Sequence, residues 1–464
     1  MITPRILLSL LTLTTVLISA NIARAQTYQS SNRIPVADST LGTKVSGNNS
    51  NFTIEGGLNR GQNLFHSFTD FSVPTGGGAT FINPVGNQSI ITRVTGNLFS
   101  DINGLVNTQG ANFLLINPNG MVFGPNTQLN VGKAFLGTTA NGVDLVDGSG
   151  RKITFGTNPN GDAPLLSVNP NVFFNVSRLN PGGGNAQISN FGTLQTDNPN
   201  QYIGLFGGNI SMNGGQIIAP GGRVELGGLG DVSFTNQARI DVAGAGGGDI
   251  AISARNLEIL GRSILVGGIE QGLGTPATVA GDIKLNATGA ILLGSNSIVA
   301  NNVGLNSSGN GGNIIVDTGS LFLLEGAQLQ SLTYGKGNAG NVKVTAKDAV
   351  FLTSPGTTIL STVEAGAVGK GGTIDINAGS LFLKDGAQLA TITRGASATQ
   401  PAGQGDAGNV KVKVTGAVDI SGQNTFFSGI RSAVETGTKG NGGNITIDAG
   451  SFSLGDGARL EAST

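Results

Sequence analysis

Apolar and polar residues alternate in short runs through the second half of the chain. Val342 and Val344 alternate with Asn341 and Lys343, and residues 409–414 repeat the pattern. A period of two places alternate side chains on opposite faces of a strand. Residues 246–464 are therefore expected to form strands with one buried face and one solvent-facing side.

The strand pattern also recurs along the chain. Gly-rich segments that each lead into an alternating run lie 33, 31, 28, 32, 36 and 35 residues apart and begin near Gly247, Ala280, Gly311, Ala339, Gly371, Ala407 and Gly442. One unit, GNIIVDT-GSLFLLEG-AQLQSLT, offers three short strands joined by Gly-containing corners. A repeat of this length with three strands is typical of one coil of a parallel β-helix.

These repeats predict an all-β protein whose repeat region is a right-handed parallel β-helix, that is, a solenoid. Each coil would add ~4.8 Å along the axis, the ordinary spacing of paired strands. A propeller is the alternative for repeats of this size. Its blades need four antiparallel strands with hairpin turns, and the sequence does not show that turn pattern.

One polar position of the repeat predicts a column of stacked amides. The same register, directly before the first strand of the unit, holds Asn313, Asn341, Asn409 and Asn444, with Thr373 as an interruption. Stacked Asn side chains can hydrogen-bond from one strand to the next. We therefore expect an Asn ladder along one corner of the β-helix.

Insertions fall at a single place in the repeat. Residues 333–339, 394–407 and 436–441 all precede the next Gly-Asn-Val/Ile segment, so they should stack on one edge. This edge is either a contact surface or a set of tolerated solvent loops.

Residues 26–245 lack the regular period but keep strand-like alternation and turns rich in Asn, Gly and Pro. A solenoid needs its open end covered, because an exposed sheet edge invites aggregation. We therefore expect residues 26–245 to cap the β-helix formed by residues 246–464.

A turn with flanking apolar runs stands out in this N-terminal region. Asn117, Pro118, Asn119 and Gly120 separate FLLI from MVF, and Asn, Pro and Gly stand where a β-turn prefers them. Similar Asn-Pro-Asn segments occur elsewhere, so the motif by itself predicts only a turn.

Composition suggests an exported protein. Arg5, the apolar run Ile6–Ala20 and the Ala23-Arg24-Ala25 site predict a signal peptide over residues 1–25. The chain has no cysteine, so packing and hydrogen bonds must stabilise it without disulfides. Charged residues make up 11% and the net charge is −1, which argues against a nucleic-acid partner.

Three blocks of the N-terminal region resemble the filamentous haemagglutinin-type secretion domain of two-partner secretion exoproteins. They are NRGQNLFHSFTDFSV (59–73), ITRVTGNLFSDINGLV (91–106) and ANFLLINPNGMVFGPNTQLNVGKAFLGTTA (111–140). The resemblance covers roughly residues 30–250. Asn117–Gly120 matches the family's NPNG turn, whereas its NPNL signature has only the imperfect counterpart Asn169–Val172.

The resemblance implies a route and a use. The route is export to the periplasm of a Gram-negative-type envelope, then passage through a dedicated outer-membrane β-barrel transporter with periplasmic recognition domains. The use is adhesion at the cell surface, with cell-surface glycans or proteins as ligands. Family exoproteins are usually longer, and Thr464 falls inside a repeat, so we expect a fragment, a short paralogue or a last coil covered by a partner.

No catalytic, cofactor or metal site is expected. Asp317, Asp375 and Asp448 are expected to recur in one register about two coils apart, which is wide for a glycosidase pair. The single histidine, His66, has no triad partners in the pattern and is expected to pack within the cap. The Gly-rich segments lack the Gly-Lys-Ser/Thr of a phosphate loop.

The sequence therefore predicts a secreted adhesin or haemagglutinin-like exoprotein that is not an enzyme. Asn117–Gly120 would act either as a transporter-recognition turn or as a turn that nucleates the cap. A β-helical polysaccharide-cleaving enzyme and a structural matrix protein are the alternatives, and a contact-dependent toxin would need an effector domain that the sequence does not show.

Overall fold

The computed structural model describes residues 27–48, 50–146, 152–157, 185–195, 201–422 and 427–464. The predicted signal peptide, residues 1–25, and the Asn169–Val172 segment lie outside these residues. The described residues form strands, turns and loops. Within them, no helix has the length and apolar character needed to cross a membrane.

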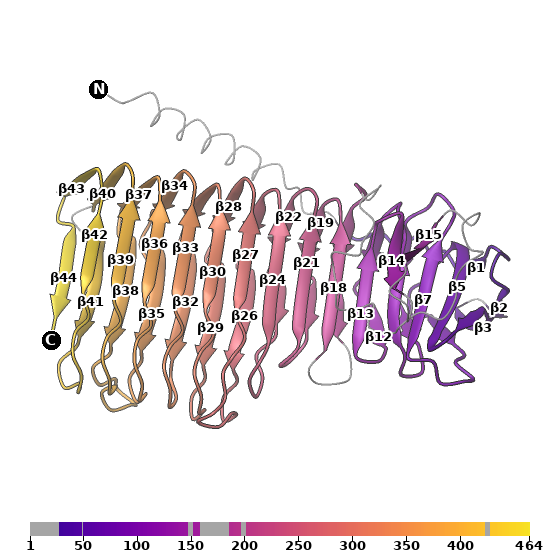
Figure 1. The fold of residues 1–464 in the computed structure, drawn as a ribbon, viewed down its shortest axis with the longest axis horizontal. Helices are drawn as coiled ribbons and strands as arrows, with labels where there is room; N and C mark the ends of the chain where they lie inside the picture. The colour runs from indigo at the N-terminus through magenta and orange to yellow at the C-terminus, as the bar shows by residue number, and fades with distance from the viewer. Residues whose placement is uncertain (1–26, 49, 147–151, 158–184, 196–200, 423–426) are drawn as a thin grey trace.

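Three long sheets run side by side along the molecule (Figure 1). The fifteen-stranded sheet contains, in spatial order, β1 (Val36–Ala37), β5 (Asn63–Asp70), β7 (Ser89–Val94), β10 (Asn112–Ile116), β13 (Ala134–Thr138), β18 (Tyr202–Gly207), β21 (Arg223–Gly228), β24 (Asp249–Ala254), β27 (Ile283–Ala287), β30 (Ile314–Thr318), β33 (Val342–Ala346), β36 (Ile374–Ala378), β39 (Val410–Val414) and β42 (Ile445–Asp448), with β4 (Leu58–Arg60) paired to β5. The twelve-stranded sheet contains β8 (Ser100–Ile102), β11 (Met121–Phe123), β16 (Ile188–Asn190), β19 (Ile210–Asn213), β22 (Val232–Thr235), β25 (Leu257–Ile259), β28 (Ala290–Leu293), β31 (Ser320–Leu323), β34 (Ala349–Leu352), β37 (Ser380–Lys384), β40 (Ala417–Ser421) and β43 (Ser451–Gly455).

The third side is shared by two sheets. In the first coils it is a five-stranded sheet of β2 (Thr43–Asn48), β3 (Asn51–Gly56), β6 (Gly78–Phe81), β9 (Leu105–Asn107) and β12 (Gln128–Asn130). From there a ten-stranded sheet continues with β17 (Thr193–Gln195), β20 (Gln216–Ile218), β23 (Arg239–Asp241), β26 (Ile264–Ile269), β29 (Ile298–Val303), β32 (Gln328–Thr333), β35 (Thr358–Val363), β38 (Gln388–Thr393), β41 (Gly429–Val434) and β44 (Arg459–Ser463). A separate hairpin consists of β14 (Gly142–Val146) and β15 (Lys152–Gly156).

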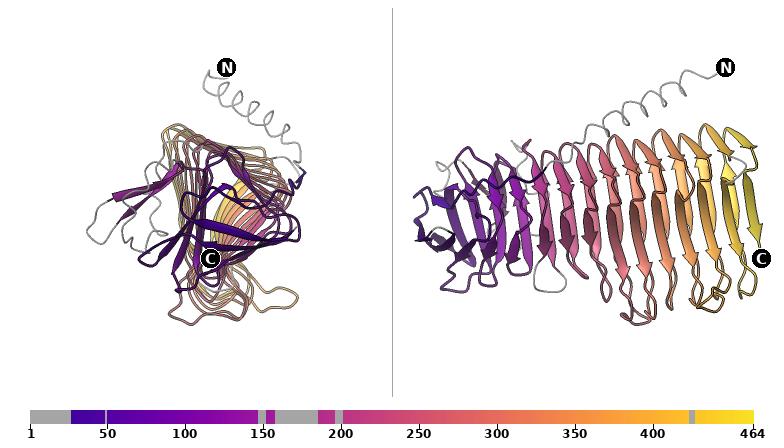
Figure 2. Two further views of the ribbon diagram at one scale, coloured as in Figure 1. Left: turned by 90° about the vertical axis from the view of Figure 1, so that its right-hand side faces the viewer. Right: turned by 180° about the vertical axis from the view of Figure 1, so that it is seen from behind.

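Three consecutive strands make one coil of a right-handed parallel β-helix, which confirms the predicted fold class. Strands β30, β31 and β32 pair in parallel with β33, β34 and β35 of the next coil, and right-handed crossovers are the rule for such parallel connections. Seen along the axis, the three sides enclose one interior (Figure 2). The register matches the sequence repeats, since Ile283, Ile314 and Val342 are neighbours across coils.

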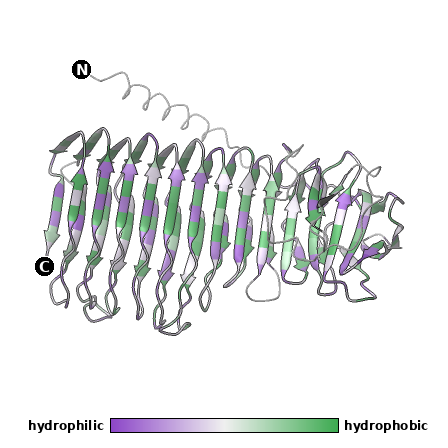
Figure 3. Ribbon diagram, viewed as in Figure 1, coloured by the Kyte–Doolittle hydropathy of each residue, from purple (hydrophilic) through white to green (hydrophobic). Residues whose placement is uncertain are grey.

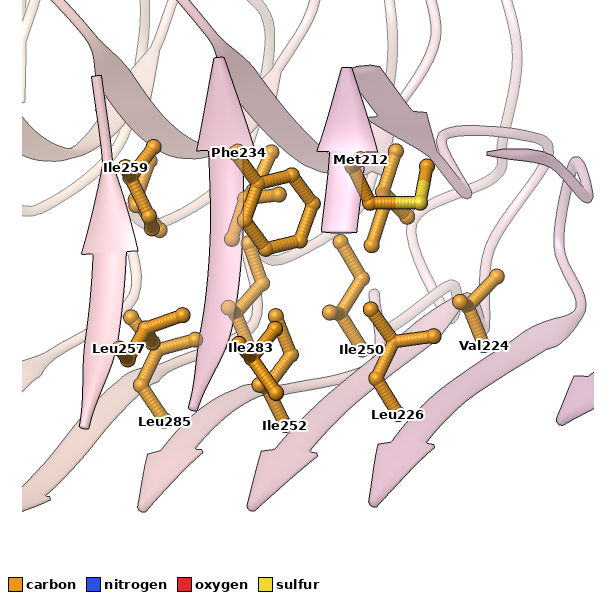
Figure 4. Packing of buried hydrophobic residues seen from close by; sticks show 14 of the residues in the cluster. Met212, Val224, Leu226, Phe234, Ile250, Ile252, Leu257, Ile259, Ile283 and Leu285 are labelled. Carbon is orange, nitrogen blue, oxygen red and sulfur yellow. The ribbon is translucent and has the colours of Figure 1, made fainter. Parts of the chain in front are cut away.

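Apolar side chains from all three sides fill this interior. Columns of aliphatic residues run from coil to coil, such as Ile250 beside Ile283 (Figure 4). In the same way, Leu257 lies beside Ile291. The outward positions are mostly polar, which produces the alternating colours along each strand in Figure 3. The period of two therefore separates core from solvent as expected.

The cap is smaller than the sequence suggested. Strands β1 and β4 pair antiparallel with β5, and β2 pairs antiparallel with β3. Parallel coils begin already at β5 and β7, so most of the described residues between 27 and 245 belong to the β-helix. Parallel pairing also continues from β21 to β24, through the expected boundary at residue 245.

The first coils have a different core from the later ones. Phenylalanine rings at 68, 71, 81, 113 and 135 contact one another, with centroids 5.0 to 6.3 Å apart along the series. Aromatic rings bury large areas, so this cluster stabilises the end where fewer coils stack.

The amide ladder is present in part, and it is longer than predicted at one end. Asn341 donates its backbone N–H and side-chain Nδ2 to Asn313 Oδ1, both at 3.0 Å, and Asn444 N donates to Asn409 Oδ1 at 2.8 Å. Thr373 joins through its backbone N–H, which donates to Asn341 Oδ1. The column also extends to Asp282, whose carboxylate accepts from Asn313.

Side-chain hydroxyls form a second column inside the β-helix. Ser331, Ser361, Thr391 and Ser432 occupy one register and are 0% exposed. Ser361 Oγ donates to Gly340 O and accepts from Gly372 N, both at 2.8 Å. These small polar residues thus satisfy backbone groups at a corner that is closed to water.

The insertions stack on one edge, as predicted. Isolated parallel bridges join Lys336 to Val368, Val368 to Gln404 and Gln404 to Lys439. The loops project together below the strands in Figure 1.

Candidate functional site

The Asn117–Gly120 segment is a hydrogen-bonded β-turn at the corner between β10 and β11. Gly120 N donates to Asn117 O at 3.1 Å, and Asn119 N donates to Asn117 Oδ1 at 3.0 Å. Gly120 has φ +111°, and a Cβ there would lie 2.8 Å from Gln187 O. The turn therefore needs glycine both for its backbone angle and for its closeness to the neighbouring coil.

Asn117 binds this turn to the coil before it. The side chain is 0% exposed, and its Nδ2 donates to Leu98 O and Ser100 Oγ, both at 3.0 Å. Its backbone N–H donates to Thr138 O of the following coil at 2.9 Å. Asn117 thus connects three successive coils.

The outer side of the turn is open to solvent. Asn119 is exposed, Pro118 is half-buried, and Asn119 Nδ2 donates to Gly96 O at 2.8 Å. The loop that receives this bond carries two exposed apolar side chains, Leu98 at 44% and Phe99 at 39%. We call Leu98, Phe99, Pro118 and Asn119 the corner patch.

Sequence reasoning missed Leu98 and Phe99. They lie inside the quoted block ITRVTGNLFSDINGLV, between Gly96 and Ser100, where two adjacent apolar residues cannot both face inward from a strand. The occurrence of two adjacent apolar residues in a loop was the sequence signal that could have indicated an exposed apolar surface. A guanidinium also lies here, since Arg33 Cζ is 4.5 Å from the centre of the Phe99 ring.

His66 packs in the interior of the first coil, as expected. It is 0% exposed, and its Nδ1 lies 3.2 Å from Thr43 Oγ1. Burial lowers the pKa of His66 to about 4. The imidazole is therefore neutral at physiological pH and serves packing.

The expected aspartate register is wrong for one member. Asp317 is the neighbour of Thr345, but Asp375 is the neighbour of Lys343 on one side and Lys411 on the other. The two aspartates stand at different positions of their strands, because Asp375 directly follows the first buried residue of β36 and Asp317 comes two residues later in β30. Asp317 and Asp448 do share a column, four coils apart, or about 19 Å.

Asp317, Asp375 and Asp448 are thus not neighbours of one another across adjacent coils. No group of three or more potential metal-ligating side chains occurs among the described residues. The corner patch itself offers apolar surface, an amide and backbone groups, which suit binding and not bond cleavage.

The TPS secretion domain family model matches residues 34–250. A search of curated proteins finds no match. Among solved structures, the HMW1 secretion domain from Haemophilus influenzae is similar at 15% identity, covering 91% of this chain and 98% of that chain, with a TM-score of 0.44. The filamentous hemagglutinin secretion domain is similar at 14% identity, covering 93% and 100%, with a TM-score of 0.22.

At these TM-scores the assignment depends on the family model, which spans the three sequence blocks and the Asn117–Gly120 turn. A TPS secretion domain is a secretion and structural module, not a catalytic one. It implies a TpsB transporter that carries the chain across the outer membrane of a Gram-negative cell. Residues 34–250 of the chain are thus a TPS secretion domain, which supports a two-partner secretion exoprotein.

Proposed function

We propose that the protein is an adhesin or haemagglutinin-like exoprotein, and that the transporter recognises its N-terminal region at the corner patch. One observation carries this proposal. The NPNG turn divides into an inner half, Asn117 and Gly120, held by neighbouring coils, and an outer half beside exposed Leu98 and Phe99. The inner half builds the corner, and the outer half presents side chains that a partner can contact.

Exposed apolar side chains beside a fixed polar group are a common form of binding surface. The loop beneath them is held in place, because Leu98 O and Ser100 Oγ accept hydrogen bonds from the buried side chain of Asn117. Binding there would cost little ordering of the chain. In this proposal the signal peptide, residues 1–25, first directs export to the periplasm.

The domain assignment is part of the same proposal. Residues 26–245 act as the secretion domain, and residues 246–464 form the shaft displayed at the cell surface. The stacked insertions, with exposed Tyr334 and Val368, are the surface we propose for cell-surface glycans or proteins. No catalytic step is included.

Secretion and stability measured together test the recognition site. The Leu98→Ala/Phe99→Ala and Asn119→Ala variants should be released less into the medium when the transporter is present, with the melting temperature of the purified protein unchanged. Asn117→Ala should lower the melting temperature, because it removes a buried side chain that bonds two neighbouring groups. Val85→Ala is the matched control, since Val85 is 65% exposed and lies outside the patch.

The two halves of the turn give different results only if the proposal is right. Wild-type release of Leu98→Ala/Phe99→Ala and Asn119→Ala would exclude the corner patch as the recognition surface. Equal loss of release for Val85→Ala would show a general effect of surface changes.

A further inference from the structure

An extended arm, residues 27–33, lies against the outside of the first coils. Its contacts centre on Asp101 of β8, which is 2% exposed. Tyr28 Oη donates to Asp101 Oδ1 at 2.8 Å, and Ser31 N and Oγ both donate to Asp101 Oδ2 at 2.6 Å. A carboxylate removed from water needs such hydrogen bonds, and the arm supplies three of them.

The arm also contacts the coils on either side of Asp101. Arg33 Nε is 3.4 Å from Asp70 Oδ2 in the coil before it. The Tyr28 ring lies over Gly124, which belongs to the coil after that of Asp101. A Cβ added at Gly124 would be 2.7 Å from Tyr28 Cζ. One coil further, the rings of Tyr28 and Phe191 have centroids 5.7 Å apart.

These contacts join four successive coils, represented by Asp70, Asp101, Gly124 and Phe191. In a solenoid each coil touches only its neighbours, so a free end can open one coil at a time. A segment that crosses four coils changes this, because no single coil can leave without breaking contacts of the arm. The end should then open as one unit.

We propose that residues 27–33 are a latch that closes over Asp101 and makes the first four coils open and close together. The latch closes last, since its binding surface exists only when those coils have stacked. Opening it exposes Asp101 and the ring faces of Phe99 and Phe191. The same movement frees the loop at Phe99, over which Arg33 lies.

The latch should also be open at one stage of export and closed at another. This part of the inference rests on the proposed function. A chain that passes through a transporter cannot keep contacts that span four coils. The latch is therefore open during passage and closes in the released protein. Weakening it should loosen the released protein without reducing its release.

Hydrogen exchange of the purified full chain, together with secretion, tests this. The Tyr28→Phe/Ser31→Ala variant removes the side-chain donors of the arm to Asp101, and Gln29→Ala is the control, because Gln29 is an exposed residue of the same arm. We expect amides of β7, β8 and β11 to exchange at least about ten-fold faster in the first variant. Gln29→Ala should match the wild type, as should amides of the later coils and the released amount of both variants.

Two results would overturn the inference. Faster exchange confined to residues 27–33 would show that the arm rests on the coils without coupling them. Reduced release of Tyr28→Phe/Ser31→Ala with unchanged exchange would show that the arm acts in recognition and not as a latch. The exchange measurement needs no transporter, so it stands even if the corner patch fails its own test.

Discussion

His66 offers a direct test of how the first coil is built. It is the only histidine of the chain, so its imidazole signals need no assignment. The ring lies 5.2 Å from Phe81 and 6.2 Å from Phe68, measured between centroids, and its Nε2 has no hydrogen-bond partner among the described residues. Protonation would therefore place a charge among aromatic rings.

The structure sets the sign and size of the resulting pH dependence. Burial lowers the pKa of His66 from 6.5 to about 4 in the folded protein. Below pH 6.5 His66 binds a proton in the unfolded chain but not in the folded protein. The contribution of this group to the free energy of unfolding is therefore fully present above pH 6.5 and is lost as the pH falls towards 4. The free energy of unfolding should decrease by about 2 kcal/mol at pH 5 and about 3 kcal/mol at pH 4 from this group alone.

Two measurements check these values on the full chain. Titration of the imidazole by NMR should give a midpoint near pH 4. Denaturant unfolding at several pH values, compared with His66→Asn, should give a difference in free energy that changes with pH below 6.5. Other groups titrate in both proteins, and the comparison cancels them. The cavity left by the substitution shifts the whole curve of the variant without changing its slope.

A midpoint near pH 6.5 would refute the reasoning, because it would mean that water reaches the ring. Parallel stability curves for the two proteins between pH 7 and pH 4 would do the same. Either result would place His66 outside the sealed core of the first coil.

Two further predictions concern the corners of the shaft. Ser361→Ala should lower the free energy of unfolding by about 1–3 kcal/mol in denaturant titrations, because two buried backbone groups lose their partner. Ser320 is half-buried, so Ser320→Ala should change this free energy little. Equal effects of the two substitutions would argue against the hydroxyl column. The Asn313→Ala/Asn341→Ala variant should lower the melting temperature, since it removes hydrogen bonds of about 1 kcal/mol each, and an unchanged melting curve would mean that the ladder contributes nothing to stability.

The repeat region shows how much local pattern can predict. Strict alternation around Val342 and Val410 places side chains on two faces of a strand. The repeat spacing equals the number of residues in the sequence between paired positions of adjacent coils. The repeat spacing could be counted because equivalent segments recur in the sequence. The alternation belongs to the backbone geometry of strands, so it does not depend on distant parts of the chain. The same holds for the Asn117–Gly120 turn, whose residue types match the backbone angles that a turn needs.

Other features could not be predicted because they depend on which coil lies beside which. Asp317 and Asp375 look equivalent in the sequence, but the register places Asp375 between two lysines. The irregular spacing of residues 26–245 concealed parallel coils, because excursions such as the β14–β15 hairpin interrupt the period.

The sequence by itself therefore determined the strand period, the repeat, the turn and the family resemblance. Only the tertiary structure decided which half of the turn faces solvent, and that Tyr28 and Asp101, 73 residues apart, meet at one point. The physical reason is that alternation is a local property of a strand. Contacts between coils follow from the exact length of every loop between them, and no single segment carries that information.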